Sequence, residues 1–409
     1  MTWLTATEAL RVLGVRPQTL YANVSRKKIR AKPDPKDTRR SLYHEVDVRK
    51  LARQHGGRRK ATVVAAGAIE WGDPVLSSAV STAVDGRLYY RGKDAVELSE
   101  SGTFEEVAGL LWDADAVDFE AAWRNVPGIK ARASIAPLPV ATPLQRAFYT
   151  LGHRAGTDLS SYGRTLPVLQ AEAAGVLVTL VAAMLESGPL ARPSDPLHQQ
   201  IAAAFGRRSS ADALRRTLVL LADHELNAST FAARVAISTG APLSAAVLSG
   251  LATLSGPLHG RASLGVLDLV ISVEQLGADK AVREWLSQGR PIVGFGHPLY
   301  PAGDPRATAL LEQLALPRAY TDLSDAVESL IGERPNIDFA LAALTKVHRL
   351  PPDAPLILFA LGRCAGWLAH ALEQVTTGSP IRPRARYVGP PISSSTSSLV
   401  TSASGWPER

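Results

Sequence analysis

The sequence predicts a mostly α-helical protein with a small basic module at its amino end. Apolar residues make up 46% and charged residues 20% of the 409 residues, which is a composition that can bury a core. From residue 61 onward, apolar positions recur at helical spacing, whereas strand-like patterns are confined to short pieces. Basic residues concentrate at the amino end, where residues 1–60 hold 16 of the 45 Lys and Arg but 5 of the 38 Asp and Glu.

The first 60 residues therefore carry a net charge of +11, and the rest of the chain carries −4. Such a block indicates a polyanion-binding surface, because each cation placed on a phosphate releases a counterion. An ordinary solvated basic face is the alternative. Capping and turn residues predict a sequence of short elements. These are a helix capped by Thr5 and Glu8, a turn at Gly14, a second helix at 18–25, a hairpin at 29–43 and a third helix at 46–53.

This order of elements resembles the winged helix-turn-helix of the mercury-resistance-regulator and excisionase type. The resemblance implies duplex DNA as a partner, with one set of side chains in the major groove and another on phosphates. A retained fold used for dimer contacts is the alternative. The implied groove residues are Arg16, Gln18, Thr19 and Tyr21, and the implied phosphate contacts are Arg26, Lys27, Lys28, Arg39 and Arg40.

A Gly- and Arg-rich linker at 55–60 separates this module, residues 1–60, from a body at 61–389. One short strand is expected at 88–90, after a Gly turn. The remaining 390–409 are rich in Ser, Thr and Pro, and we expect a mobile tail there. Helices are predicted at 104–112, 175–185, 211–221, 243–254 and 356–374.

Composition excludes several classes of protein. The single Cys364 rules out a disulfide framework, and nine His without metal-ligand spacing argue against a metal site. The amino terminus lacks a signal-peptide pattern. The longest apolar stretch, 173–185, is shorter than the roughly 20 residues that a membrane helix needs. We therefore expect a cytoplasmic protein with no membrane partner and no bound metal.

Four polar motifs interrupt the Ala- and Leu-rich body. Each sets a His or an Asp beside Gly, Pro or a predicted helix start, where the backbone can approach a ligand closely. A lone His in a loop is more often structural, so no motif establishes a site by itself. The motifs are 223–230 with His224, 255–260 with His259, 293–306 with His297 and Arg306, and 334–339 with Asp338.

Together with 84–92 and 381–389, these motifs stand in the order found in citrate synthases, and residues 65–389 resemble that family. The resemblance implies a homodimer in which a smaller domain, at about 262–350, closes over the substrate. The sequence thus predicts a mostly α, citrate-synthase-like two-domain helical fold, preceded by a small winged helix-turn-helix domain.

The family reaction joins the enolate of acetyl-CoA to the ketone of oxaloacetate and then hydrolyses the thioester, so acetyl-CoA is a co-substrate and no cofactor is bound. The match implies Asp338 as the base, His259 as donor to the thioester oxygen and His297 as the group that polarises the ketone. A helix start should keep His259 neutral. The implied oxaloacetate contacts are His224, Arg306, Arg363 and Arg382, the last from the partner subunit.

Arg363 lies in a small apolar run, 362–367, so we expect its guanidinium to be buried and to need an anion. An ordinary surface Arg is the alternative. His370, two turns further along the same predicted helix, is interpreted as a packing residue.

Two positions depart from the family pattern. Arg261 replaces the second Gly of a His-Gly-Gly-Ala loop. Pro298 replaces an Arg that many citrate synthases carry, and a Pro there also occurs in methylcitrate synthases. One alternative function is therefore a 2-methylcitrate synthase that uses propionyl-CoA. The other is a DNA-binding regulator whose synthase-like body only senses a metabolite. The coenzyme A contacts stay unassigned.

Overall fold

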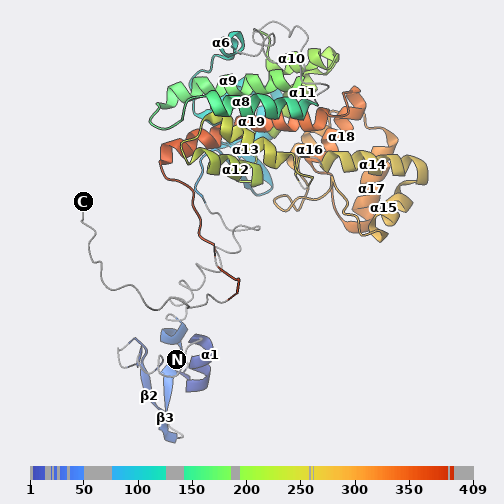
Figure 1. The fold of residues 1–409 in the computed structure, drawn as a ribbon. Helices are drawn as coiled ribbons and strands as arrows, with labels where there is room; N and C mark the ends of the chain where they lie inside the picture. Colours follow the sequence, from blue (N-terminus) through green and yellow to red (C-terminus); the bar gives the residue numbers. More distant parts are fainter. Residues whose placement is uncertain are drawn as a thin grey trace. The chain divides into compact units, whose positions relative to one another are not determined.

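The computed structural model describes residues 3–13, 20, 23–24, 28–34, 37–49, 76–125, 142–185, 194–257, 259–260, 262–385 and 387–390. The chain divides into two compact units between Ser77 and Ser78 (Figure 1).

The amino-terminal unit combines one helix with a small antiparallel sheet. The strands β1 (Trp3–Leu4), β2 (Ala31–Asp34) and β3 (Asp37–His44) are ordered β1-β3-β2, and Ala31 pairs with Tyr43. Helix α1 (Ala6–Leu13) packs beside them. Its core is small and consists of Ala9, Leu20, Ile29, Tyr43 and Val48.

Two predictions for this unit are confirmed. A Glu8 carboxylate oxygen accepts a hydrogen bond from the Thr5 amide at 2.8 Å, which is the expected cap. The β2–β3 pairing forms the hairpin expected at 29–43. Most of the second helix and most of the implied DNA contacts lie outside the described residues or side chains. Of those contacts, Lys28 is exposed and Arg39 and Arg40 lie on β3, whereas Arg16, Gln18, Thr19, Tyr21, Arg26 and Lys27 are not described.

The second unit begins with a three-stranded antiparallel sheet and continues as helices. The strands are β4 (Ser81–Val84), β5 (Arg87–Tyr90) and β6 (Lys93–Asp94). The helices of the first part are α4 (Ala95–Ser101), α5 (Phe104–Trp112), α6 (Phe119–Arg124), α8 (Pro143–Thr157), α9 (Leu166–Leu185), α10 (Leu197–Ala204), α11 (Ala211–Leu221), α12 (Ala228–Ile237) and α13 (Leu243–Leu254). Those of the second part are α14 (Ala262–Leu276), α15 (Ala278–Ser287), α16 (Pro305–Leu311), α17 (Arg318–Ile331), α18 (Ile337–His348) and α19 (Ala354–Thr377).

The mostly helical prediction is confirmed. Three predicted helices match α5, α11 and α13 from end to end. The other two predicted ranges fall inside α9 and α19, which are longer than the apolar pattern indicated. The strand predicted at 88–90 is part of β5.

The larger hydrophobic core surrounds α19, which runs between α5, α9, α11, α12 and α13 (Figure 1). Close approach to α19 depends on small residues. A Cβ on Gly362 would come within 2.7 Å of the Leu221 Cβ, and one on Gly250 would come within 2.7 Å of the Trp367 ring. The first of these contacts brings the end of α11 against the middle of α19, where Arg363 lies.

A smaller core lies among α14, α15, α17 and α18. Helix α18 serves both cores, since Ile337 and Leu341 belong to the larger one and Phe339 and Ala343 to the smaller one. The amino end of α18 therefore lies at the junction of the two cores.

Two helices, α9 and α19, are long and apolar enough to cross a membrane by length and composition alone. Their most apolar windows are 61% and 94% buried inside the protein. The α19 window is thus accounted for by its place in the larger core.

Candidate active site

His224 lies in the short connection between α11 and α12. It is 7% exposed, and its Nε2 lies 2.9 Å from the Tyr300 hydroxyl. Its ring centroid lies 5.0 Å from that of His297, in an edge-on arrangement. Helix α12 starts directly after this connection because Asn227 accepts hydrogen bonds from the amides of Ser229 and Thr230. The cap therefore fixes where the connection ends.

His259 faces the first turn of α12. Its Nε2 lies 2.9 Å from the Ser229 hydroxyl oxygen, and its ring centroid lies 6.1 Å from that of Phe359 on α19. The same hydroxyl accepts a hydrogen bond from the Trp367 indole at 3.2 Å and donates to the Asn227 side chain at 2.7 Å. One buried serine thus links His259 to the cap of α12 and to the central helix.

The His297 loop is joined by backbone hydrogen bonds to the start of α18. The Gly296 amide donates to the Arg334 carbonyl at 2.8 Å, and the Asn336 amide donates to the Gly294 carbonyl at 2.9 Å. Both glycines have positive φ, and a Cβ on Gly294 would come within 2.3 Å of Val266. Glycine is therefore required at position 294 for this close approach.

Asp304 and Arg306 form a buried, two-pronged ion pair at the start of α16. The guanidinium donates to the two carboxylate oxygens at 2.9 and 2.8 Å, and both side chains are at most 2% exposed. The same carboxylate accepts a hydrogen bond from the Ile337 amide at 3.1 Å. This pair therefore links α16 to the start of α18, where Asp338 lies.

Arg363 is 1% exposed on α19, so the prediction that its guanidinium is buried is confirmed and the surface alternative is wrong. Its Nε donates to the Leu221 carbonyl at 3.0 Å. Within the described residues its Nη2 has no hydrogen-bond partner, and no carboxylate lies within ion-pair distance. A buried guanidinium without a direct ion-pair partner costs several kcal/mol of folding free energy, which an anionic ligand would offset.

The three imidazoles are held neutral at neutral pH. Burial lowers the pKa of both His259 and His297 to about 4, helped by Arg363 at His259 and by Arg306 at His297. Burial is the main cause that lowers the pKa of His224 well below its ordinary value, and Arg306 and Arg363 lower it further. The sequence predicts a neutral His259 from its place near a helix start. In the structure, burial and the neighbouring Arg363 favour the neutral form instead.

Asp338 has the opposite perturbation. The residue is half-buried, but its Oδ1 is fully buried and has no hydrogen-bond partner in the described part of the chain. Burial raises the pKa of Asp338 to about 7, and Arg306 partly opposes this rise. A carboxylate with a near-neutral pKa suits a general base.

The structure does not bring all predicted residues together. Arg382 is exposed on the segment that follows α19, and no hydrogen bond or ion pair joins it to the cluster among the described residues. Pro298 is exposed in the His297 loop, and Arg261 lies outside the described residues. The chain therefore supplies five groups to one cluster, His224, His259, His297, Arg306 and Arg363, with Asp338 beside Arg306 and Asp304.

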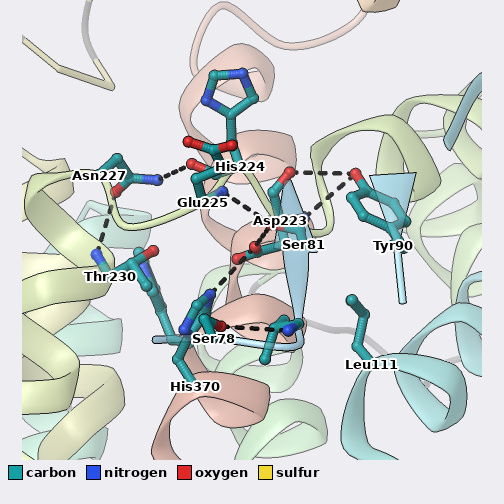
Figure 2. A network of polar contacts seen from close by, with 12 residues as sticks. Ser78, Ser81, Tyr90, Leu111, Asp223, His224, Glu225, Asn227, Thr230 and His370 are labelled. Carbon is teal, nitrogen blue, oxygen red and sulfur yellow. Dashed lines mark hydrogen bonds and ion pairs between the residues drawn. The ribbon is translucent and has the colours of Figure 1, made fainter. Parts of the chain in front are cut away.

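Sequence reasoning missed the groups that hold this cluster. Asp223, Ser229 and Tyr300 lie inside the motifs already noted but were not singled out. The sequence signal that could identify them is their position, since each lies within a few residues of a site His. The interpretation of His370 as a packing residue is incomplete, because its Nε2 is hydrogen-bonded to Asp223 (Figure 2).

Two further features bear on ligands. A cavity of about 200 Å³ opens beside the His259 loop, lined by Gly260, Ser263, Leu264, Pro352, Asp353 and Leu356. In the described residues, no group of three or more His, Cys, Asp or Glu side chains is placed to hold a metal ion.

A family model described as citrate synthase, C-terminal domain, matches residues 69–384. Citrate synthase 2 of Bacillus subtilis is 32% identical over 355 residues, which cover 77% of this chain and 93% of the relative. The 2-methylcitrate synthase 2 of Corynebacterium glutamicum is 27% identical over 351 residues, covering 74% and 88%.

Solved structures of citrate synthases are also similar to this chain. The citrate synthase of Thermotoga maritima is 28% identical with a TM-score of 0.65, covering 78% of this chain and 94% of that one. A Thermoplasma acidophilum citrate synthase, solved with carboxymethyl coenzyme A and oxaloacetate, is 25% identical with a TM-score of 0.67, covering 80% and 96%.

Proposed function

Because the chain belongs to the citrate synthase family and is an enzyme of this kind, we propose that it condenses acetyl-CoA with oxaloacetate and hydrolyses the thioester to release citrate. The observation that carries the proposal is Arg363, a buried guanidinium with an unpartnered Nη2, next to neutral imidazoles. A small dianion such as oxaloacetate supplies the missing countercharge.

Oxaloacetate would lie among His224, His297, Arg306 and Arg363. Arg363 has donor capacity to spare, whereas Arg306 is already paired with Asp304 and would share its remaining donors with the substrate. His297 would donate to the ketone oxygen and make that carbonyl the better electrophile. The solved Thermoplasma protein holds oxaloacetate together with a coenzyme A derivative, which supports this substrate pair.

Proton transfer would be shared between Asp338 and His259. Asp338, with a pKa of about 7, would remove the α proton of the acetyl group. His259, as a neutral imidazole, would donate from Nδ1 to the thioester oxygen as the enolate forms. For that tautomer the Ser229 hydroxyl must donate to Nε2 instead of to Asn227. Acetyl-CoA would be a co-substrate that approaches by the cavity beside His259, with no bound cofactor or metal.

A homodimer would complete the site. Arg382 is exposed and apart from the cluster of its own chain, which suits a residue that acts in a partner subunit. Helices α8 and α9 and their connection expose the large apolar side chains Tyr149, Leu159, Tyr162 and Val168. Such a surface is suited to association. Sedimentation of the chain, and activity of Arg382→Leu mixed with an Asp338→Asn chain, would test the shared site.

The residues of the smaller core lie within 262–350, which we propose as a domain that closes over oxaloacetate. The decisive test of the reaction is thiol release from acetyl-CoA, measured with and without oxaloacetate. Release that depends on oxaloacetate, with citrate as the product, is the expected result. Thiol release that is independent of oxaloacetate would contradict the proposal.

The second candidate activity is 2-methylcitrate synthesis from propionyl-CoA. It is favoured by Pro298 and by the similarity to the Corynebacterium 2-methylcitrate synthase. The ratio of kcat/KM for acetyl-CoA and propionyl-CoA separates the two reactions, because both use the same oxaloacetate contacts.

For residues 1–60 we propose a winged helix-turn-helix that binds duplex DNA in the cytoplasm. The net charge of +11, the capped α1 and the β2–β3 hairpin support it. A chain that binds DNA but lacks condensation activity would instead be a regulator whose body senses a metabolite.

A further inference from the structure

A buried polar network lies behind the site, on the side of the α11–α12 connection away from His224 (Figure 2). Asp223 and His370 are both 0% exposed, and the His370 Nε2 lies 3.2 Å from a carboxylate oxygen of Asp223. The Ser81 hydroxyl donates to the same oxygen. Figure 2 shows the Asp223 carboxylate and the His224 ring extending to opposite sides of the chain. Asp223 therefore cannot touch a ligand that His224 binds.

The direction of the hydrogen bonds at His370 follows from its other neighbour. The Arg234 guanidinium lies 3.3 Å from the His370 Nδ1, and an arginine can only donate. The Nδ1 must therefore accept, so the ring carries its proton on Nε2 and donates it to Asp223. Arg234 is itself held by Glu373 at 2.6 Å and by Gln374 at 3.0 Å.

The backbone on either side of Asp223 is also held. The Tyr90 hydroxyl lies 3.2 Å from the Asp223 carbonyl oxygen and accepts a hydrogen bond from the Asp223 amide at 3.4 Å, and the Gly366 amide donates to the Ala222 carbonyl at 2.9 Å. A Cβ on Gly366 would come within 2.1 Å of Asp223 Oδ1, which has no hydrogen-bond partner among the described residues, so glycine admits the carboxylate against α19. Fixing residue 223 in this way also fixes where His224 points.

The charge of Asp223 acts on Arg363. Burial lowers the pKa of Arg363 to about 10, Asp223 opposes that change, and Arg306 adds to it. Burial raises the pKa of Asp223, but His370 and Arg363 outweigh it, so the pKa lies below its ordinary value and the group is an anion. Asp304 is already paired with Arg306. Among the described residues, Asp223 is therefore the anion that most strongly favours the charged form of Arg363.

We propose that Asp223 is a positioning residue for oxaloacetate binding: held by Ser81 and His370, its carboxylate favours the charged form of Arg363 without forming an ion pair with it, and its backbone directs His224 into the site. The inference rests on the proposed function, because it concerns how the same site takes its dianion.

The first test is Asp223→Asn, which keeps the size of the side chain and removes its charge. Oxaloacetate KM should rise about tenfold, with little change in the KM for the acyl donor. Calorimetric oxaloacetate affinity should also be lost at a pH about one unit lower than in the wild-type chain, because Arg363 then loses its proton more readily. The loss of oxaloacetate affinity at high pH is the alkaline limb of binding. The ionisable groups that face Arg363 and set this limb are Tyr90, Asp223, His224, His259, Tyr300 and Arg306.

Asp94→Asn is the matched control, since Asp94 is 7% exposed, caps α4, and Asn caps helices equally well. It should leave both oxaloacetate KM and the alkaline limb unchanged. If Asp223→Asn left the oxaloacetate KM and the alkaline limb of oxaloacetate binding unchanged, or if Asp94→Asn changed both in the same way, the inference would be overturned.

His370 supplies a second test that does not depend on the folding of Asp223→Asn. His370→Leu should raise oxaloacetate KM, whereas His370→Gln should restore it, because Gln can accept from Arg234 and donate to Asp223. Equal behaviour of the two variants would contradict the inference. Nitrogen NMR of labelled histidine tests it without substrate, since the His370 ring should be protonated at Nε2 and bare at Nδ1. A ring protonated at Nδ1 would overturn the inference, and absence of thiol release in the wild-type chain would overturn only the proposed function.

Discussion

Arg363 offers the sharpest prediction, because the two arginines of the site differ in what they are bonded to. Arg363→Leu removes a buried cation that has no ion pair in the described residues, whereas Arg306→Leu breaks a buried pair with Asp304. Loss of an unpaired buried charge relieves a desolvation penalty of several kcal/mol. Because Asp223 then loses part of its compensating charge and the Leu221 carbonyl loses its donor, we expect the free Arg363→Leu chain to be destabilised, but by less than Arg306→Leu.

The same substitution should severely weaken oxaloacetate binding. Truncating one partner of a buried charge pair costs about 2–5 kcal/mol, which raises the dissociation constant about 30-fold to several thousand-fold. Arg306→Leu should weaken binding too, but it should also lower folding stability by about 3–5 kcal/mol, because Asp304 is left unpaired. The two variants therefore separate binding from folding.

Calorimetry with oxaloacetate and thermal unfolding without ligand, on both variants, make the test. Arg215→Leu is the control: Arg215 is 7% exposed and donates to the carbonyls of Ser99 and Gly102, outside the cluster. It should lower the Tm and leave oxaloacetate affinity unchanged. Unchanged affinity in Arg363→Leu, or a loss of Tm as large as that in Arg306→Leu, would refute the reasoning.

Asp338→Asn should abolish exchange of solvent deuterium into the acetyl group while oxaloacetate binding stays nearly unchanged; wild-type exchange rates would remove Asp338 as the base. Because the pKa of Asp338 is raised to about 7 and the base must be ionised, kcat/KM for the acyl donor should fall as pH drops through about 7; a limb near the ordinary aspartate pKa would count against this assignment. Deleting residues 1–60 should abolish duplex binding, whose log affinity falls with log salt at a slope of about −5 for six phosphate contacts, and should leave thiol release intact; fluorescence anisotropy and thiol assays on both chains measure this, and equal duplex binding by both chains would exclude the module as the DNA reader.

The sequence by itself determined the helical character of the body. Apolar residues at helical spacing predicted α5, α11 and α13 to their end residues, because a helix that buries one face must repeat its apolar positions about every turn. For α9 and α19 the pattern understated the length, because nearly every side of α19 is buried and periodicity then fades. The motifs also identified the chemistry-bearing residues, since Gly, Pro and Asn mark where loops end and helices begin.

Tertiary structure alone decided which of those residues meet and in what charge state. His259 is neutral because of burial and Arg363, which lies more than 100 positions further along the chain, and Asp338 has a raised pKa because its oxygen is enclosed at the junction of two cores. The Asp223–His370 contact joins residues 147 positions apart. Electrostatic coupling depends on distance in space and on exclusion of water, and neither quantity is written in the local sequence.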